Sequence, residues 1–256
     1  MNTFIDTHSH VDFEEIQTDF SAVMEKCAEV GVKKIIIPGV TKEDTPRIMD
    51  LAEKHENLYA LVGVHPSEAK TWNDSCYDYF KNLLSQKKVV GVGEIGLDYY
   101  WDKSFNDIQQ DILRKQIELA KEVKKPICIH DRDAHADTLR ILKEMNAKEV
   151  GVVLHCFSGS LEFMRECIKE GFFIALGGVV TFKNAIKPQE VAKEVPLERL
   201  FLETDAPYLT PVPHRGETNY PYYIPLIAEH IAALRGISTE EVAETTTKNA
   251  EEFWGI

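Results

Sequence analysis

The sequence of 256 residues has no long apolar run, no paired cysteines and no excess of basic residues. No stretch approaches the roughly 20 apolar residues that cross a bilayer, so we expect no membrane span. The opening Met-Asn-Thr-Phe is not a basic segment followed by an apolar one, which predicts no secretory signal. The five cysteines form no Cys-x-x-Cys pair, which is typical of reduced thiols. We therefore expect a cytoplasmic protein, acting as a monomer.

The charge balance is acidic, with a formal net charge of −13 at pH 7. This disfavours a protein that coats nucleic acid non-specifically, because such binding needs a basic face. It does not exclude a small pocket that holds phosphate groups with metal ions and a few cationic side chains.

Short apolar runs alternate with amphipathic helical stretches along the whole chain, which is the pattern of parallel βα units. The runs that we predict as strands are Thr3–Thr7, Lys34–Pro38, Tyr59–Val64, Val89–Gly93, Pro126–Ile129, Gly151–Leu154, Phe172–Leu176 and Leu200–Leu202. Helix signals lie between them. Ser104 with Asp107 resembles a capping box that opens a helix over Ile108–Val123, and Ser238 with Glu241 resembles one that opens the last helix.

Eight βα units in a chain of this length predict an α/β fold, a (β/α)8 TIM barrel, as a single domain over residues 1–256. The alternative is a doubly wound open sheet, which usually carries a Gly-rich phosphate loop after its first strand. Here the first strand leads into His8-Ser9-His10, so we favour the barrel. Its chemistry is then expected at the C-terminal ends of the strands.

Metal-ligating residue types collect at those ends. Six of the eight predicted strands are followed by His, Asp or Glu, namely His8, His10, His65, Glu94, His130, His155, Glu203 and Asp205. A single histidine after an apolar run is more often structural, but the joint pattern supplies enough ligands for two divalent ions. A central carboxylate could bridge the ions, and Glu94 is the candidate. Two ions about 3.5–4 Å apart can activate a water and stabilise both oxygens of a phosphate-ester displacement.

Several motifs then carry a resemblance to a known family. They are Phe4-Ile-Asp-Thr-His-Ser-His-Val-Asp12, Gly93-Glu-Ile-Gly-Leu-Asp-Tyr-Tyr100, Pro126-Ile-Cys-Ile-His-Asp-Arg-Asp-Ala134, His155-Cys-Phe-Ser-Gly159, Leu202-Glu-Thr-Asp-Ala-Pro207 and Pro213-His-Arg-Gly-Glu-Thr-Asn219. In this order they resemble the motifs of the TatD family, metal-dependent deoxyribonucleases of the amidohydrolase-like barrel superfamily.

The resemblance implies two divalent ions and their ligands. One ion would be held by His8, His10, Glu94 and Asp205, and the second by Glu94, His130 and His155. Histidine ligands suit Zn, Mn, Fe or Ni, whereas the family commonly works with Mg, so the identity of the ions stays open.

Roles for the other polar residues are hypotheses. Asp205 would bind a metal and accept a proton from the attacking water. Glu203 would orient ligands or be a paired buried carboxylate. His65 would contact the scissile phosphate or protonate the leaving oxygen, unless it only caps a helix. Arg132 and Arg215 would fork onto phosphate oxygens.

A second group of side chains follows Glu94. Asp98, Tyr99, Tyr100 and Trp101 would either line the barrel mouth and stack on bases or form a packed lid over it.

The expected function is a metal-dependent deoxyribonuclease, a 3′–5′ exonuclease that engages DNA locally, on single strands or ends. The alternative is another ester or amide hydrolase on the same barrel, such as one that removes D-amino acids from tRNA. A non-catalytic metal-binding or nucleic-acid-binding protein is disfavoured, because every expected ligand is present.

Overall fold

The computed structural model describes residues 2–256, which divide into two compact units. Unit 1 comprises residues 2–37, 156–165 and 174–256, and unit 2 comprises residues 38–155 and 166–173. The single domain over residues 1–256 stays a prediction. No helix of the described residues is both long and apolar enough to cross a membrane.

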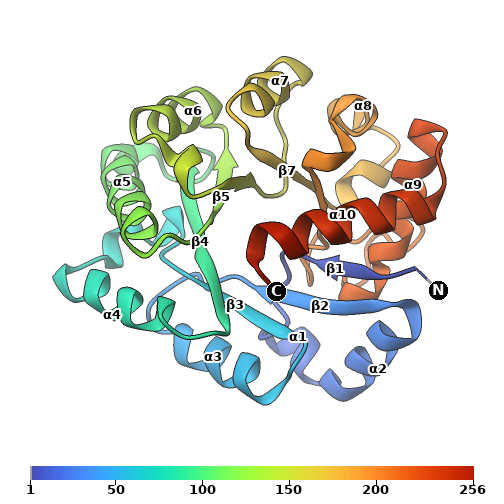
Figure 1. Cartoon of the computed structure of the whole chain (residues 1–256), viewed down its shortest axis with the longest axis horizontal. Coiled ribbons are helices and arrows are strands. Elements are labelled where there is room, and N and C mark those ends of the chain that lie inside the picture. Colours follow the sequence, from blue (N-terminus) through green and yellow to red (C-terminus); the bar gives the residue numbers. More distant parts are fainter. Residues whose placement is uncertain (1) are drawn as a thin grey trace. The chain divides into compact units, whose positions relative to one another are not determined.

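Unit 1 carries both ends of the described chain. Its elements are β1 (Phe4–Asp6), α1 (Glu14–Gln17), α2 (Phe20–Val30), β2 (Val32–Ile37), most of β7 (Phe173–Leu176), η4 (Gly178–Thr181), α8 (Ile186–Glu194), η5 (Leu197–Arg199), β8 (Leu200–Leu202), η6 (Pro221–Tyr223), α9 (Ile224–Arg235) and α10 (Thr239–Trp254). β1 pairs with β2 and β7 with β8, all parallel. α10 lies along β1 (Figure 1), also packs against β8, and buries Val242, Ala243 and Ala250.

Unit 2 is built around a second run of parallel strands. Its elements are α3 (Thr45–Lys54), β3 (Leu58–Val62), η1 (Pro66–Thr71), α4 (Asp74–Leu84), β4 (Val89–Asp98), η2 (Lys103–Phe105), α5 (Asn106–Val123), β5 (Ile127–Arg132), α6 (His135–Glu144), η3 (Ala147–Glu149) and β6 (Val152–Leu154). β3 pairs with β4, β4 with β5 and β5 with β6. α5 buries Ile112, Leu113 and Ile117 against this sheet. The chain passes between the two units within α7 (Leu161–Lys169).

All eight predicted strands are present, and their order in the sheet follows the chain from β1 to β8. Helices alternate with the strands. The fold is the predicted (β/α)8 barrel.

The two predicted capping boxes have different outcomes. The Glu241 N–H donates to Ser238 Oγ at 3.1 Å at the start of α10, as expected. The box at Ser104 is wrong, because α5 begins at Asn106 without a side-chain cap. The Ser104 N–H instead donates to Asp102, which caps the short helix η2.

β4 is longer than predicted, and this changes the position of Glu94. The strand does not end at Gly93 but continues to Asp98. Residues 95–98 pair with residues 129–132 of β5, which also outruns its predicted end. Glu94 and His130, which we placed just after strands, therefore lie inside strands; His130 pairs with Gly96, and Glu94 lies at the register shift between Val92 and Ile95.

Candidate metal centre

In unit 2, three imidazoles surround one carboxylate oxygen. Glu94 Oε1 lies 2.7 Å from His130 Nδ1, 2.9 Å from His155 Nε2 and 3.4 Å from His65 Nε2. We call these four residues the Glu94 group. Ligand atoms of a tetrahedral ion with bonds of about 2.1 Å are roughly 3.4 Å apart, so these spacings are close to those of a coordination shell. Oxygen and nitrogen donors of this kind suit a divalent transition metal.

The orientation of His130 is set by Asp98, whose role sequence reasoning missed. Asp98 Oδ2 lies 3.0 Å from His130 Nε2, on the far side of the ring from Glu94. With its proton on Nε2, the neutral ring directs the Nδ1 lone pair toward Glu94. Burial raises the pKa of Asp98, but hydrogen bonds from His130 and the Tyr100 N–H outweigh it and bring that pKa below its ordinary value. Asp98 is therefore the negatively charged support of a candidate metal-binding histidine.

His65 joins the Glu94 group, although we assigned it no ligand position. Its Nδ1 accepts a hydrogen bond from the Ser67 N–H at 3.1 Å, so this nitrogen carries no proton. Burial lowers the pKa of His65, which favours the neutral ring with its proton on Nε2. His65 thus caps η1 and at the same time points an N–H donor at Glu94.

Two buried glutamines of α5 hold backbone next to the Glu94 group. Gln116 accepts from the Val64 N–H at 2.7 Å and donates to the Val64 carbonyl at 3.0 Å, directly before His65. Gln109, about two helical turns earlier, makes the same pair of bonds with Asp98, at 2.8 and 2.9 Å. Each side chain satisfies both backbone groups of one residue, so α5 holds the backbone directly before His65 and at the end of β4.

In unit 1, a second ligand group is formed by His8, His10 and Asp205. Asp205 Oδ1 lies 3.8 Å from His8 Nε2 and 3.7 Å from His10 Nε2. Both histidines are buried, whereas the Asp205 side chain is 16% exposed and can meet solvent. Two imidazoles and a carboxylate around one point are a donor set for a divalent ion. We call this the Asp205 group.

Hydrogen bonds between two loops position the Asp205 group. The Asp205 N–H donates to the His8 carbonyl at 2.9 Å, and the His10 N–H donates to the Ala206 carbonyl at 2.8 Å. Buried Asp6 accepts from the Thr204 N–H and also bonds the Thr204 hydroxyl. Burial raises the pKa of Asp6 to about 8, in spite of these bonds.

Asn219, the last residue of the Pro213–Asn219 motif, also stabilises the loops around the Asp205 group. Its side-chain amide donates to the Thr204 carbonyl at 2.8 Å and to the Tyr208 carbonyl at 2.6 Å. The side chain is fully buried, so its role here is to hold the loop after β8.

The remaining predicted site residues lie as follows. Glu203 is fully buried and accepts from the Cys156 N–H, and its role in orienting ligands stays a prediction. The Arg215 guanidinium stacks over Phe182, 3.7 Å from the ring centroid. Arg132 stacks over Tyr100 at 3.9 Å. Contacts of either arginine with phosphate stay predictions.

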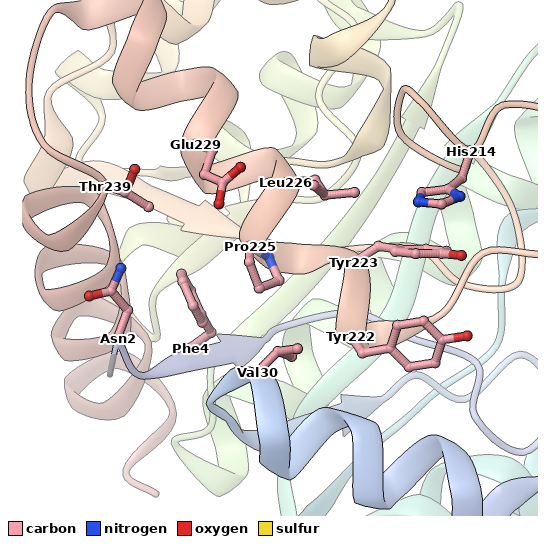
Figure 2. A pocket seen from close by; sticks show the side chains of 10 residues that line it. All are labelled: Asn2, Phe4, Val30, His214, Tyr222, Tyr223, Pro225, Leu226, Glu229 and Thr239. Atoms are coloured by element: carbon pink, nitrogen blue, oxygen red, sulfur yellow. The ribbon is translucent and has the colours of Figure 1, made fainter.

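A cavity of about 410 Å³ in unit 1 lies apart from these residues. Figure 2 shows its wall, to which Tyr222, Tyr223 and His214 contribute rings and Glu229 a carboxylate. Phe4, at the start of β1, also lines it, whereas His8 follows the end of that strand. None of the predicted ligands lines this cavity.

Known proteins resemble this chain over almost its whole length. The family model described as TatD related DNase matches residues 5–255. The chain belongs to the TatD family. TatD relatives of similar length include YabD of Bacillus subtilis, an uncharacterized metal-dependent hydrolase that is 46% identical over 251 residues, 98% of each chain. YcfH of Escherichia coli, with the same description, is 39% identical over 257 residues, 98% of this chain and 96% of its own.

A solved structure supports the same assignment. YjjV, a TatD homologue from Escherichia coli, superposes with a TM-score of 0.93 at 34% identity, covering 99% of this chain and 98% of its own. This TatD protein is therefore a metal-dependent hydrolase. The division of ligands between two ions, with Glu94 in both sets, stays a prediction.

Proposed function

We propose that this TatD protein is a deoxyribonuclease that hydrolyses phosphodiester bonds, as a 3′–5′ exonuclease on single strands or ends. The observation that carries the proposal is the His65 Nε2–H, which points at the carboxylate that His130 and His155 also approach. A hydrogen-bond donor at this place can stabilise the charge that develops on the leaving oxygen of a phosphodiester. The family name and the expected phosphate-directed arginines support the same substrate.

The residues of the two groups would have different roles in the reaction. Divalent ions bound in the two groups would supply charge that activates water and neutralises phosphate oxygens. Asp98 holds His130 so that its Nδ1 lone pair remains available. Asp205, partly open to solvent, accepts the proton of the attacking water, and the His65 N–H donates to the leaving oxygen. The protein acts as a cytoplasmic monomer on DNA engaged locally.

The test is cleavage of end-labelled single-stranded oligonucleotides by metal-loaded protein, in parallel with hydrolysis of a D-aminoacyl-tRNA. We expect cleavage of the oligonucleotide, shortened from its 3′ end. Deacylation without DNA cleavage would replace the proposal with the ester-hydrolase alternative.

Variants separate metal binding from proton transfer. Glu94→Ala should lose bound metal and cleavage together. Asp205→Asn and His65→Ala should each lower kcat by about 10²–10⁴-fold. His65→Ala should retain its metal, measured by elemental analysis after gel filtration. Metal loss in His65→Ala would make this residue a ligand, and near wild-type turnover of metal-loaded Asp205→Asn would remove its role as base.

A further inference from the structure

An arginine and two exposed aromatic residues form a cluster at the far end of the β4–β5 ladder. Tyr100 is 51% and Trp101 72% exposed, and their rings meet edge to face with centroids 4.8 Å apart. The Arg132 guanidinium lies 3.9 Å from the Tyr100 centroid and 5.4 Å from that of Trp101. We call Tyr100, Trp101 and Arg132 the stacking platform. Its exposure contradicts the alternative of a packed lid for these two aromatic residues.

Tyr99, the neighbouring aromatic residue, is not part of the platform. Its hydroxyl donates to Asp137 at 3.0 Å and accepts from Gln110, so its ring faces α5 and α6. Of the three consecutive aromatic residues, one anchors the segment and the other two present their rings to solvent.

Short contacts through Asp98 connect the stacking platform with the Glu94 group. The Tyr100 N–H donates to Asp98 Oδ1 at 2.9 Å, and the other oxygen of Asp98 lies 3.0 Å from His130 Nε2. Arg132 follows His130 by two residues on β5 and pairs with Asp98 across the ladder. At the rise of a strand, the platform begins roughly 7 Å from the His130 backbone.

From this geometry we infer that Tyr100, Trp101 and Arg132 bind one unpaired nucleobase of the substrate, next to the phosphate that is cleaved. The inference rests on the proposed nuclease function and names the feature that selects single strands. An aromatic face accepts any base, but only a base whose own face is open, which a base inside a duplex is not. The Arg132 guanidinium can stack and donate to the adjoining phosphate at the same time.

The charge of the chain makes stacking the main contribution. With a net charge of −13, the protein as a whole repels DNA, and the platform brings one cation. Trp, Tyr and Arg are also enriched in protein interfaces. The hydrogen-bonded link to His130 favours the substrate over a protein partner, because it places the rings beside the reacting group.

The first experiment compares steady-state kinetics on two substrates, a single-stranded oligonucleotide and the same strand with abasic sites near its 3′ end. Trp101→Ala should raise KM for the normal strand roughly 5- to 150-fold with kcat nearly unchanged, the range expected from loss of one stacked base. On the abasic strand, wild type and Trp101→Ala should have equal KM. Ile186→Ala, which also truncates a well-exposed apolar side chain, is the matched control and should match wild type.

The second experiment needs no turnover. Trp101 is far more exposed than the half-buried Trp72 or buried Trp254, so a stacked base should quench mainly its emission. Titration of metal-depleted protein with the normal strand should quench fluorescence, the abasic strand should not, and Trp101→Phe should abolish the signal.

The outcomes distinguish the two proposals. DNA cleavage with an unchanged KM in Trp101→Ala would overturn the platform and leave the nuclease standing. Quenching by the normal strand without any cleavage would uphold the platform and remove the nuclease. Equal binding of normal and abasic strands by wild type would also overturn the platform.

Discussion

The Glu94 group and the Asp205 group use the same residue types but are built in different ways. Glu94 and His130 lie inside strands that continue beyond them, and the ladder of residues 95–98 with residues 129–132 begins directly after Glu94. His8, His10 and Asp205 follow short strands, and backbone hydrogen bonds between their loops, together with the Asp6 side chain, hold them. Added side-chain volume in the β4–β5 ladder should therefore destabilise the Glu94 group. Loss of a buried polar side chain should destabilise the Asp205 group.

The largest expected loss of stability comes from a substitution in the β4–β5 ladder. A Cβ on Gly96 would lie 1.9 Å from the His130 carbonyl oxygen, and its φ of +150° is disfavoured for other residues. Gly96→Ala should therefore lower the free energy of unfolding by about 3–5 kcal/mol and displace His130. Gly171→Ala, with a positive φ but nothing within 4 Å, should cost only about 1 kcal/mol. Chemical denaturation measures the stability of the two variants, and elemental analysis measures their metal content. Equal losses in the two variants would show that backbone conformation, not the close approach, is what matters.

The loops of the Asp205 group provide the matching test. Asp6→Ala leaves the buried Thr204 and His8 N–H groups without their acceptor and should cost about 3 kcal/mol. Asp6→Asn keeps an acceptor oxygen and can donate to the Thr204 hydroxyl. Because the pKa of Asp6 is raised to about 8, the neutral amide should cost under about 1 kcal/mol at pH 7. If Asn proves as damaging as Ala in thermal unfolding, the charged carboxylate is what the loops require.

The glutamine contacts of α5 should have an intermediate effect. Gln116→Leu leaves the Val64 N–H and carbonyl buried without partners, which should cost about 2 kcal/mol and lower kcat by displacing His65. Gln110→Leu, on the same helix, removes contacts with side chains alone and is the matched control. If Gln116→Leu and the control have equal kcat, the contact between Gln116 and Val64 contributes to stability and not to catalysis.

The smallest change in stability should come from Asp98→Asn, which keeps the shape of the side chain. This substitution should instead weaken metal affinity roughly 10- to 100-fold, because an amide stabilises the His130 tautomer with its proton on Nε2 less well than a carboxylate does. Titration with a chelator measures this. An unchanged affinity would mean that the ladder alone orients His130.

The sequence predicted the number of strands, their order and the residue types near their C-terminal ends, because apolar runs and turns are local signals. The continuation of β4 was missed, since two glycines around Glu94 are typical of a loop. The role of Asp98 depends on how the His130 ring is turned, which no local pattern contains. Gln109 and Gln116 did leave a signal, because both fall on the apolar stripe of α5 with Ile112 and Leu113.

The β4–β5 ladder also limits how this protein can vary. Two candidate ligands, Glu94 and His130, lie on these strands together with Arg132 of the platform, and Tyr100 and Trp101 follow soon after β4 ends at Asp98. An insertion would reverse the facing of every side chain beyond it. Exchange of the side chains at 100, 101 and 132 would therefore alter the proposed platform without changing the distance of its backbone from the candidate ligands Glu94 and His130.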